Sequence, residues 1–199
     1  SNIKEKITTL LANKGDAYMV DSITSFDEIL LEDKWKQYER YLEFMPKTKL
    51  LESREEADDP NVITKKRISS RAKGIVFSSD DVSGELDSYI VQKKISIIKE
   101  YRVFVVCGEV QPLASVRTSK TPTTKVKTDG SVTVTPELRK YVEKVMQHCS
   151  YDLTGLDIAE TGDGFALIEV NRSPQFNGYF REAGVNIAET LIQKLVKNE

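Results

Sequence analysis

Apolar side chains recur along this sequence in two spacings, one typical of helices and the other typical of strands. Residues 3–13 and 25–42 carry apolar positions three or four apart, which predicts two helices near the N-terminus. The same spacing returns in residues 135–147, where a Thr-Pro pair suits a helix start, and in residues 184–197. The chain is therefore expected to be partly helical, with its helices separated from one another.

Between these helices, short runs rich in β-branched and aromatic residues predict strands. The runs cover residues 48–51, 61–66, 74–78, 88–92, 101–107, 110–116, 155–158 and 168–171. Gly108 and Glu109 separate two of the runs and predict a two-residue hairpin turn, whereas residues 120–131 predict a loop. Strands grouped into hairpins, with helices between the groups, favour an α+β fold over a parallel doubly wound sheet.

Composition limits the class of protein without naming a function. The chain has 199 residues, of which 39% are hydrophobic and 30% charged, which is enough apolar surface for a globular core. A net charge of -2, with dispersed basic residues, predicts no general attraction to nucleic acid. The longest apolar runs are far shorter than the roughly 20 residues that span a bilayer, so no membrane segment is predicted. Cys107 and Cys149 lack disulfide or zinc spacing, which predicts buried thiols and a cytoplasmic location.

One predicted hairpin carries the strongest chemical signal. Residues 155–158 are followed by a Gly-containing turn and by a second strand that contains Glu169 and Asn171. Side chains alternate along a strand, so Glu169 and Asn171 share a face, and a register close to the turn brings Asp157 opposite or diagonal to Glu169. Two carboxylates and an amide suit Mg²⁺, which fills its other positions with waters and substrate phosphates. The alternative is an ordinary hairpin with a solvated polar face.

Three motifs in this region resemble the end of an ATP-grasp domain. They are Gly-Leu-Asp-Ile at residues 155–158, Glu-Val-Asn-Arg-Ser-Pro at residues 169–174 and Gly-Val-Asn-Ile-Ala at residues 184–188. The resemblance is to the glutathione-synthetase and ribosomal-protein glutamate ligase branch, and it extends over about residues 33–197. It implies an α+β fold in which two lobes with mainly antiparallel sheets clamp ATP between them.

The same resemblance implies how the chain is divided. One lobe is expected at residues 33–92 and the other at residues 93–199. Residues 1–32 match the family less and are expected to form an N-terminal helical segment, a remnant of the domain that precedes the grasp in most members. Loops at residues 120–131 and 175–180 are expected to border the substrates, because binding residues concentrate on loops beside a rigid scaffold.

The resemblance also implies roles for individual residues. In the family, a lysine at a strand end reaches the ATP phosphates, which points to Lys65, with Lys66 as the competitor one position later. Arg102 matches an arginine that faces the phosphates and the acyl-phosphate, and a charge within this β-branched run should face a cleft. Lys65 and Arg102 are the catalytic candidates. The residues implied to hold Mg²⁺, or Mn²⁺ in its place, are Asp157, Glu169 and Asn171.

Further nucleotide contacts follow from the same family pattern. Lys34 opens a helix where the family has a lysine that contacts phosphate or adenine, and Arg117 is a second candidate for phosphate or a substrate carboxylate. A small, basic loop is implied to cover the phosphates. A segment between the lobes is implied to bind adenine through its backbone. The positions implied are Arg67, Ser70, Arg71 and Lys73 in the loop, and Gln92, Lys93, Lys94 and Ile95 in the adenine segment.

The activity implied by the resemblance is an ATP- and Mg²⁺-dependent ligase that joins a carboxylate to an amine and forms ADP and phosphate through an acyl-phosphate. The substrates expected are small-molecule or peptide carboxylates and amines. Two alternatives stay open, an ATP-grasp kinase and an ATP-binding module without catalysis. The sequence names neither the two substrates nor the oligomeric state.

Overall fold

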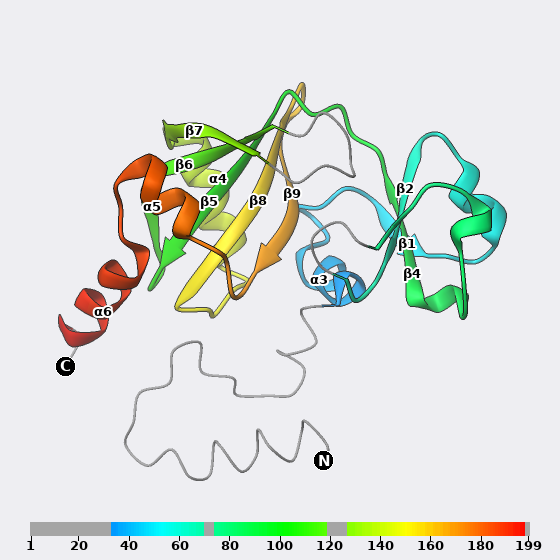
Figure 1. The fold of residues 1–199 in the computed structure, drawn as a ribbon, viewed down its shortest axis with the longest axis horizontal. Helices are drawn as coiled ribbons and strands as arrows, with labels where there is room; N and C mark the ends of the chain where they lie inside the picture. The colour runs from blue at the N-terminus through cyan, green and yellow to red at the C-terminus, as the bar shows by residue number, and fades with distance from the viewer. Residues whose placement is uncertain (1–32, 70–73, 119–126, 198–199) are drawn as a thin grey trace, which may run out of the picture.

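Two antiparallel sheets form the framework of the computed structural model, which describes residues 33–69, 74–118 and 127–197. One sheet has four strands in the order β1-β4-β2-β3, and the other has five in the order β7-β6-β5-β8-β9. Helix α3 (Lys34–Tyr41) contacts β1 of the first sheet and β9 of the second (Figure 1). The predicted α+β class is confirmed, and the helices predicted before residue 33 lie outside the described residues.

The four-stranded sheet packs a small apolar core against one of its faces. Its strands are β1 (Thr48–Leu50), β2 (Val62–Lys66), β3 (Ile75–Val76) and β4 (Tyr89–Lys93). The 3-10 helices η2 (Arg54–Asp58), η3 (Ser79–Asp81) and η4 (Leu86–Ser88) connect them. Tyr89 and Val91 are buried in this core, whereas Gln92, the next residue along β4, points to the opposite face together with Lys65.

The five-stranded sheet packs one face on helix α4 (Pro136–Met146). Its strands are β5 (Lys99–Val106), β6 (Glu109–Thr118), β7 (Lys127–Thr133), β8 (Leu153–Thr161) and β9 (Gly164–Asn171). Val103 and Leu156 from the sheet and Val142 from α4 are buried in this core. Thr135 caps α4 through its side-chain oxygen, and Pro136 lies in the first turn, as the sequence predicts.

The other face of the five-stranded sheet is divided between apolar and charged side chains. At one end, helices α5 (Asn177–Ala183) and α6 (Ile187–Lys197) cover Phe104 and Val106. The ring centroids of Phe104 and Tyr179 lie 4.7 Å apart. Beyond this cover, the same face carries the charged side chains of the candidate site.

Two local predictions of structure were wrong, and each has a physical reason. The hairpin turn between β5 and β6 is Cys107-Gly108 instead of Gly108-Glu109. Both turn residues have positive φ, 48° for Cys107 and 76° for Gly108, as a type I′ turn requires. The helix predicted over residues 25–42 does not run through Asp33, which is extended and whose side chain accepts a hydrogen bond from the Trp35 amide, whereas the implied start of a helix at Lys34 is confirmed.

Pairing and packing also overturn three expectations about the C-terminal half. Part of the predicted loop at residues 120–131 is strand β7, which pairs with β6. Part of the predicted loop at residues 175–180 belongs to α5. Ile192, one of the apolar residues whose spacing predicts a helix with a buried side at residues 184–197, is 61% exposed. No helix in the described part of the chain is long and apolar enough to cross a membrane.

Candidate functional site

A β-bulge in the hairpin of β8 and β9 decides which side chains meet. Counting from the turn, the strands pair without a shift as far as Ile158 with Leu167, and the next pair is Asp157 with Glu169. Ile168 is therefore an extra residue on β9. Asp157 and Glu169 lie directly opposite each other, in the pairing that the sequence predicts.

This bulge places the proposed metal ligands on one face. Without Ile168 as an extra residue, Glu169 would pair with Leu156 and would face the apolar core under α4. With it, Glu169 and Asn171 share the face of Asp157. Asn171 is further oriented by a hydrogen bond from its Nδ2 to the carbonyl of Gly155, 3.3 Å away.

Asp157 is the centre of a network of ion pairs on this face. Arg102, on the neighbouring strand β5, donates from Nε to Oδ1 and from Nη2 to Oδ2 of Asp157, and both distances are 2.7 Å. Arg117, on β6, donates from Nη1 to Oδ2 of Asp157 at 2.5 Å and to Oε1 of Glu100 at 3.1 Å. Since Asp157 is only 3% exposed, these charge-assisted hydrogen bonds replace water around its carboxylate.

Lys65 reaches the same region from the four-stranded sheet. Its Nζ donates to Oε1 of Gln92 at 2.8 Å, and Gln92 is itself fixed by a bond from Nε2 to Oγ1 of Thr48 at 3.1 Å. Burial lowers the pKa of Lys65 to about 8, and the nearby carboxylates of Glu169 and Glu100 oppose this shift. Lys65 is thus a half-buried ammonium that forms no ion pair among the described residues, which suits an anionic ligand.

Helix α3 brings a second lysine to this region. Gln37 pairs with the backbone of Val170 through two hydrogen bonds of 3.0 Å, which attaches α3 to the edge of β9. One turn earlier in α3, Nζ of Lys34 lies 3.9 Å from Oε1 of Glu169 and donates to the carbonyl of Ser69 at 2.7 Å. Burial lowers the pKa of Lys34, although Glu169 opposes the shift. Gln37 was absent from the predicted site, because its role depends on contacts between distant segments.

The donors on this face suit a divalent cation that is shared with phosphates. Asp157, Glu169 and Asn171 offer two carboxylates and an amide, and Mg²⁺ completes its octahedron with waters and phosphate oxygens. Burial, followed by repulsion from Asp157, raises the pKa of both Glu100 and Glu169. A nearby cation would relieve this repulsion. Within the described ranges, no three residues of the types His, Cys, Asp and Glu form a group that could hold a metal ion, so the proposed site depends on Asn171 and on the ligand as well.

Arg67, predicted to cover phosphates, instead anchors the base of its loop. Its Nε and Nη2 donate to the carboxylate of Asp33, the cap of α3, and the shortest distance is 2.6 Å. Burial by itself would raise the pKa of Asp33, but its hydrogen bonds with Arg67 and with the Trp35 amide lower it. The Asp33 cap is visible in the sequence before a helical segment, whereas its partner 34 positions later is not. Ser70, Arg71 and Lys73 lie outside the described residues.

The other predicted nucleotide residues differ in what surrounds them. Lys66 lies on the opposite face of β2 from Lys65, with Nζ 5.9 Å from the ring centroid of Tyr89. The backbone amides of Lys93 and Lys94 already donate to the carbonyls of Lys47 and Asn61. Ile95, the last residue of the predicted adenine segment, is half-buried and lies after β4.

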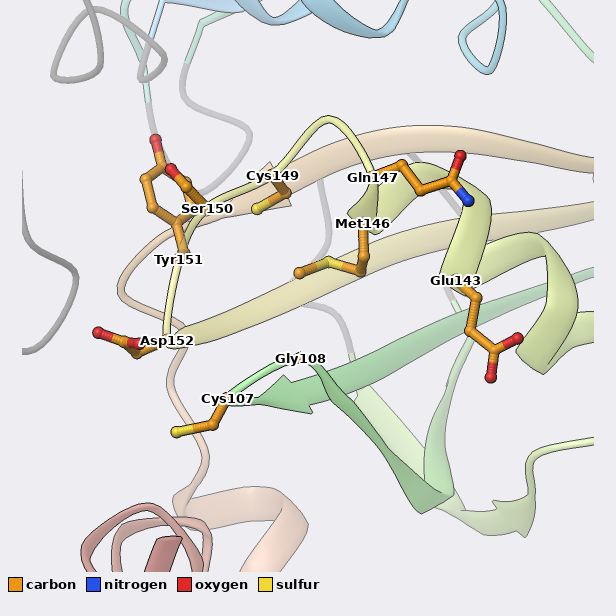
Figure 2. A pocket seen from close by; sticks show the side chains of 9 residues that line it. All are labelled: Cys107, Gly108, Glu143, Met146, Gln147, Cys149, Ser150, Tyr151 and Asp152. Carbon is orange, nitrogen blue, oxygen red and sulfur yellow. The ribbon is translucent and has the colours of Figure 1, made fainter. Parts of the chain in front are cut away.

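A separate hollow of about 380 Å³ lies at the other end of the five-stranded sheet (Figure 2). It opens between the end of α4 and the β5–β6 turn. Its lining is Cys107, Gly108, Glu143, Met146, Gln147, Cys149, Ser150, Tyr151 and Asp152. Neither Asp157 nor Lys65 borders this hollow, so it is not the candidate nucleotide site.

Comparison with protein families identifies the fold. The family profile described as the RimK-like ATP-grasp domain matches residues 58–195. This chain belongs to the RimK-like ATP-grasp family. The predicted resemblance is therefore confirmed, and the matched range contains both sheets' contributions to the charged face, including Lys65 and Asp157.

Individual relatives of this ATP-grasp chain are distant and longer. A tetrahydromethanopterin:alpha-L-glutamate ligase of Methanococcus maripaludis is 33% identical over 102 residues, which cover 50% of this chain and 35% of that protein. A protein of the same name from Methanocaldococcus jannaschii is 31% identical over 64 residues, or 32% of this chain and 22% of that protein. This chain thus matches about a third or less of the length of these relatives.

Solved ATP-grasp ligases share the fold of this chain. The ligase PsnB, solved with a minimal precursor, superposes with a TM-score of 0.70 at 17% identity, covering 97% of this chain and 70% of that chain. A RiPP-associated ATP-grasp ligase of Chryseobacterium gregarium, solved with ADP and a leader and core peptide, has a TM-score of 0.62 at 18% identity. That superposition covers 96% of this chain and 68% of that chain. The predicted ATP-grasp fold is confirmed.

Proposed function

We propose that this chain binds ATP with Mg²⁺ and catalyses ligation of a carboxylate to an amine, forming ADP and phosphate through an acyl-phosphate. The observation that carries the proposal is the convergence of four cations on one acidic face. Lys34, Lys65, Arg102 and Arg117 approach the carboxylates of Glu100, Asp157 and Glu169. Such a surface suits a highly charged ligand, because it combines donors for phosphate oxygens with donors for a divalent ion.

The chain's own residues would act mainly by positioning and by neutralising charge. A bound Mg²⁺ would offset phosphate charge during phosphoryl transfer, and Asp157, Glu169 and Asn171 are the proposed ligands. Lys65 presents a half-buried ammonium that Gln92 already holds in place, so it requires little reorganisation when it meets a phosphate oxygen. Arg102 offers two parallel N–H groups that fit a phosphate or acyl-phosphate as well as a carboxylate.

The substrate class is proposed from the relatives. Two of them are named alpha-L-glutamate ligases, so L-glutamate is the first amine that we propose to test. Structural neighbours were solved with precursor or core peptides, which supports including peptide carboxylates among the acceptors. Dependence on ATP agrees with the cytoplasmic location predicted from the cysteines. Residues 94–98, between β4 and β5, join the two sheets, which supports the predicted lobes at residues 33–92 and 93–199.

The test is a screen for ADP release that requires a metal ion, a carboxylate and an amine together. Amino acids and short peptides would be offered with Mg²⁺ or Mn²⁺, and the ligated product would be identified by mass spectrometry. We expect Lys65→Ala and Asp157→Ala to lower turnover by roughly 10²- to 10³-fold. Full activity of either variant would contradict the proposed site.

Each of these substitutions has a matched control in the same element. Lys66→Ala removes the neighbouring lysine on the opposite face of β2 and should leave turnover within about twofold. Asp163→Ala removes an exposed carboxylate in the turn of the β8–β9 hairpin and should also have little effect. ADP release that depends on a hydroxyl compound and needs no amine would instead favour a kinase. Binding of ATP without turnover would favour the inactive module.

A further inference from the structure

Both carboxylate oxygens of Asp157, a proposed metal ligand, are engaged by arginine in this structure. Arg102 forms one hydrogen bond to each oxygen, and Arg117 forms a second one to Oδ2. Asp157 is almost fully buried, so its oxygens have little access to solvent. An approaching metal ion would therefore meet two fixed positive charges at the oxygens that it needs, and electrostatic repulsion at such short range is strong in a buried site.

The two arginines differ in the partners available to them. Arg117 lies opposite Glu100 in the pairing of β5 with β6, and its Nη1 is already 3.1 Å from Oε1 of that residue. A small movement of the Arg117 side chain would thus exchange Asp157 for Glu100. Arg102 pairs with Asp157 on β8 and lies opposite the neutral Ser115 on β6. Glu169 and Glu100 also act on its charge, but in the described structure Arg102 forms its ion pair with Asp157 and with neither of these two residues. An anion that binds Arg102 from outside the chain would therefore compete with Asp157 for it.

We propose that Arg102 and Arg117, while they are bonded to Asp157, keep a metal ion away from its carboxylate. We call this arrangement the charge lock, and we propose that a nucleotide phosphate releases it. In this proposal Arg102 turns to the phosphate, whereas Arg117 turns to Glu100 instead of taking the phosphate contact that the family resemblance implies. The oxygens of Asp157 then become available to the metal ion. Glu100 is then a positioning residue that receives Arg117. The proposal rests on the proposed function and adds to it that the site binds a free metal ion weakly and a metal–nucleotide complex tightly.

The charge lock and a fixed repulsion by Arg117 predict different results when Arg117 is removed. If Arg117 only repelled cations from a fixed position, removing it would strengthen binding of a free ion and of a metal–nucleotide complex to the same extent. If Arg117 leaves Asp157 when phosphate arrives, its removal should strengthen mainly the binding of the free ion. The measurement that distinguishes the two cases is therefore how much the removal of Arg117 changes the dissociation constant of the free ion relative to that of the metal–nucleotide complex.

The experiment measures two dissociation constants for the full 199-residue chain. Binding of free Mn²⁺ is followed by electron paramagnetic resonance, and binding of the preformed Mn²⁺ complex of a non-hydrolysable ATP analogue by calorimetry. We expect Arg117→Gln to tighten the binding of free Mn²⁺ about tenfold but to change that of the complex by less than about threefold. Glu100→Gln should do the opposite and weaken binding of the complex about tenfold with a smaller effect on free Mn²⁺.

A matched control and a second variant keep the outcome decisive. Arg139→Gln removes an arginine that binds the carbonyl of Val110 and should change neither constant. Circular dichroism would verify that each variant is folded, and Glu100→Gln tests the charge lock independently if Arg117→Gln does not fold.

Three results would overturn the charge lock. The first is equal tightening of both constants by Arg117→Gln, and the second is tight binding of free Mn²⁺ by the unmodified chain. The third is a Glu100→Gln variant that binds the complex normally. Failure of the unmodified chain to bind the metal–nucleotide complex at all would be a different result, since it would remove the proposed function together with the charge lock.

Discussion

The two faces of strand β8 differ in chemistry although their residues are neighbours in the sequence. Leu156 is fully buried in the core under α4, and Asp157, the next residue, lies in a network of arginines on the other face. The apolar face contributes to stability by removing hydrocarbon from water. The charged face gathers buried ionisable groups whose desolvation opposes folding unless they are paired. Alternate residues of one strand thus contribute to the stability of the core on one face and to the candidate site on the other.

The strongest test of this division is Asp157→Asn. The amide keeps the shape of the carboxylate but loses its charge, so we expect ATP turnover to fall roughly 10²- to 10³-fold through loss of the proposed metal ligand. Turnover would be measured per folded molecule. A loss of turnover no larger than the loss of folded protein would show that the charged face has no chemical role.

The converse substitution on the apolar face is Leu156→Ala. It should lower the free energy of unfolding by about 2–5 kcal/mol, because it leaves a cavity in the core under α4. The midpoint of urea unfolding would measure this change. Turnover of the remaining folded protein should stay within about twofold of the original, as expected for a residue away from the chemistry. A loss of turnover at an unchanged free energy of unfolding would contradict the assignment of Leu156 to stability alone.

Gly155→Ala tests whether close packing near the start of β8 positions the candidate site. An added Cβ would lie 2.7 Å from Cβ of Pro174, so the segment after β9 would have to move, and with it Asn171. We expect a loss of about 1–3 kcal/mol in the free energy of unfolding, together with weaker Mn²⁺–nucleotide binding. Gly162→Ala is the control, since a Cβ there meets no atom within 4 Å. Equal behaviour of the two variants would contradict this packing argument.

The smallest expected effect concerns pH. Lys65 has its pKa lowered by burial to about 8, so it loses its proton, and with it its attraction for phosphate, as the pH rises through this value. Nucleotide binding should therefore weaken above pH 8, by at most about tenfold per pH unit. Titrations at pH 7, 8 and 9 would measure it. Lys65→Arg keeps its charge in this range, and the same decline in that variant would assign the titration to another group.

Stability should show the opposite dependence on pH from nucleotide binding. The pKa of Lys65 is lower in the folded chain than in the unfolded one, so between about pH 8 and pH 10.5 the unfolded chain binds more protons. The contribution of Lys65 to the free energy of unfolding therefore increases as the pH rises through this window and is lost as the pH falls back through it. Urea unfolding of the original chain and of Lys65→Arg across this window would isolate this contribution.

Alternation and family motifs made much of this site predictable. The positions of Asp157, Glu169 and Asn171 in a hairpin follow from strand patterns in the sequence, and the helix at residues 135–147 follows from its spacing and its cap. These features depend on residues close together in the chain. The structure places Lys65 on the face with Gln92 and Lys66 on the opposite face, and the choice of Lys65 as the phosphate contact stays a prediction.

What could not be predicted depends on register and on distant partners. Nothing in the alternation around Ile168 marks it as the extra residue, yet it decides which face Glu169 occupies. Arg67 was predicted to bind phosphate from its place in a basic loop, and its pairing with Asp33 depends on how α3 packs. The engagement of Asp157 by Arg102 and Arg117 likewise requires three strands to be aligned.

The bulge at Ile168 also separates the tip of its hairpin from the chemistry. Between the bulge and the turn at Gly162-Asp163, the pairing runs in a register that is offset by one residue from the one around Glu169. Gly162 and Asp163 are exposed, so a fluorophore or a short peptide tag placed in that turn would lie apart from the proposed ligands Glu169 and Asn171. The turn offers a place from which nucleotide binding by this chain could be followed in real time.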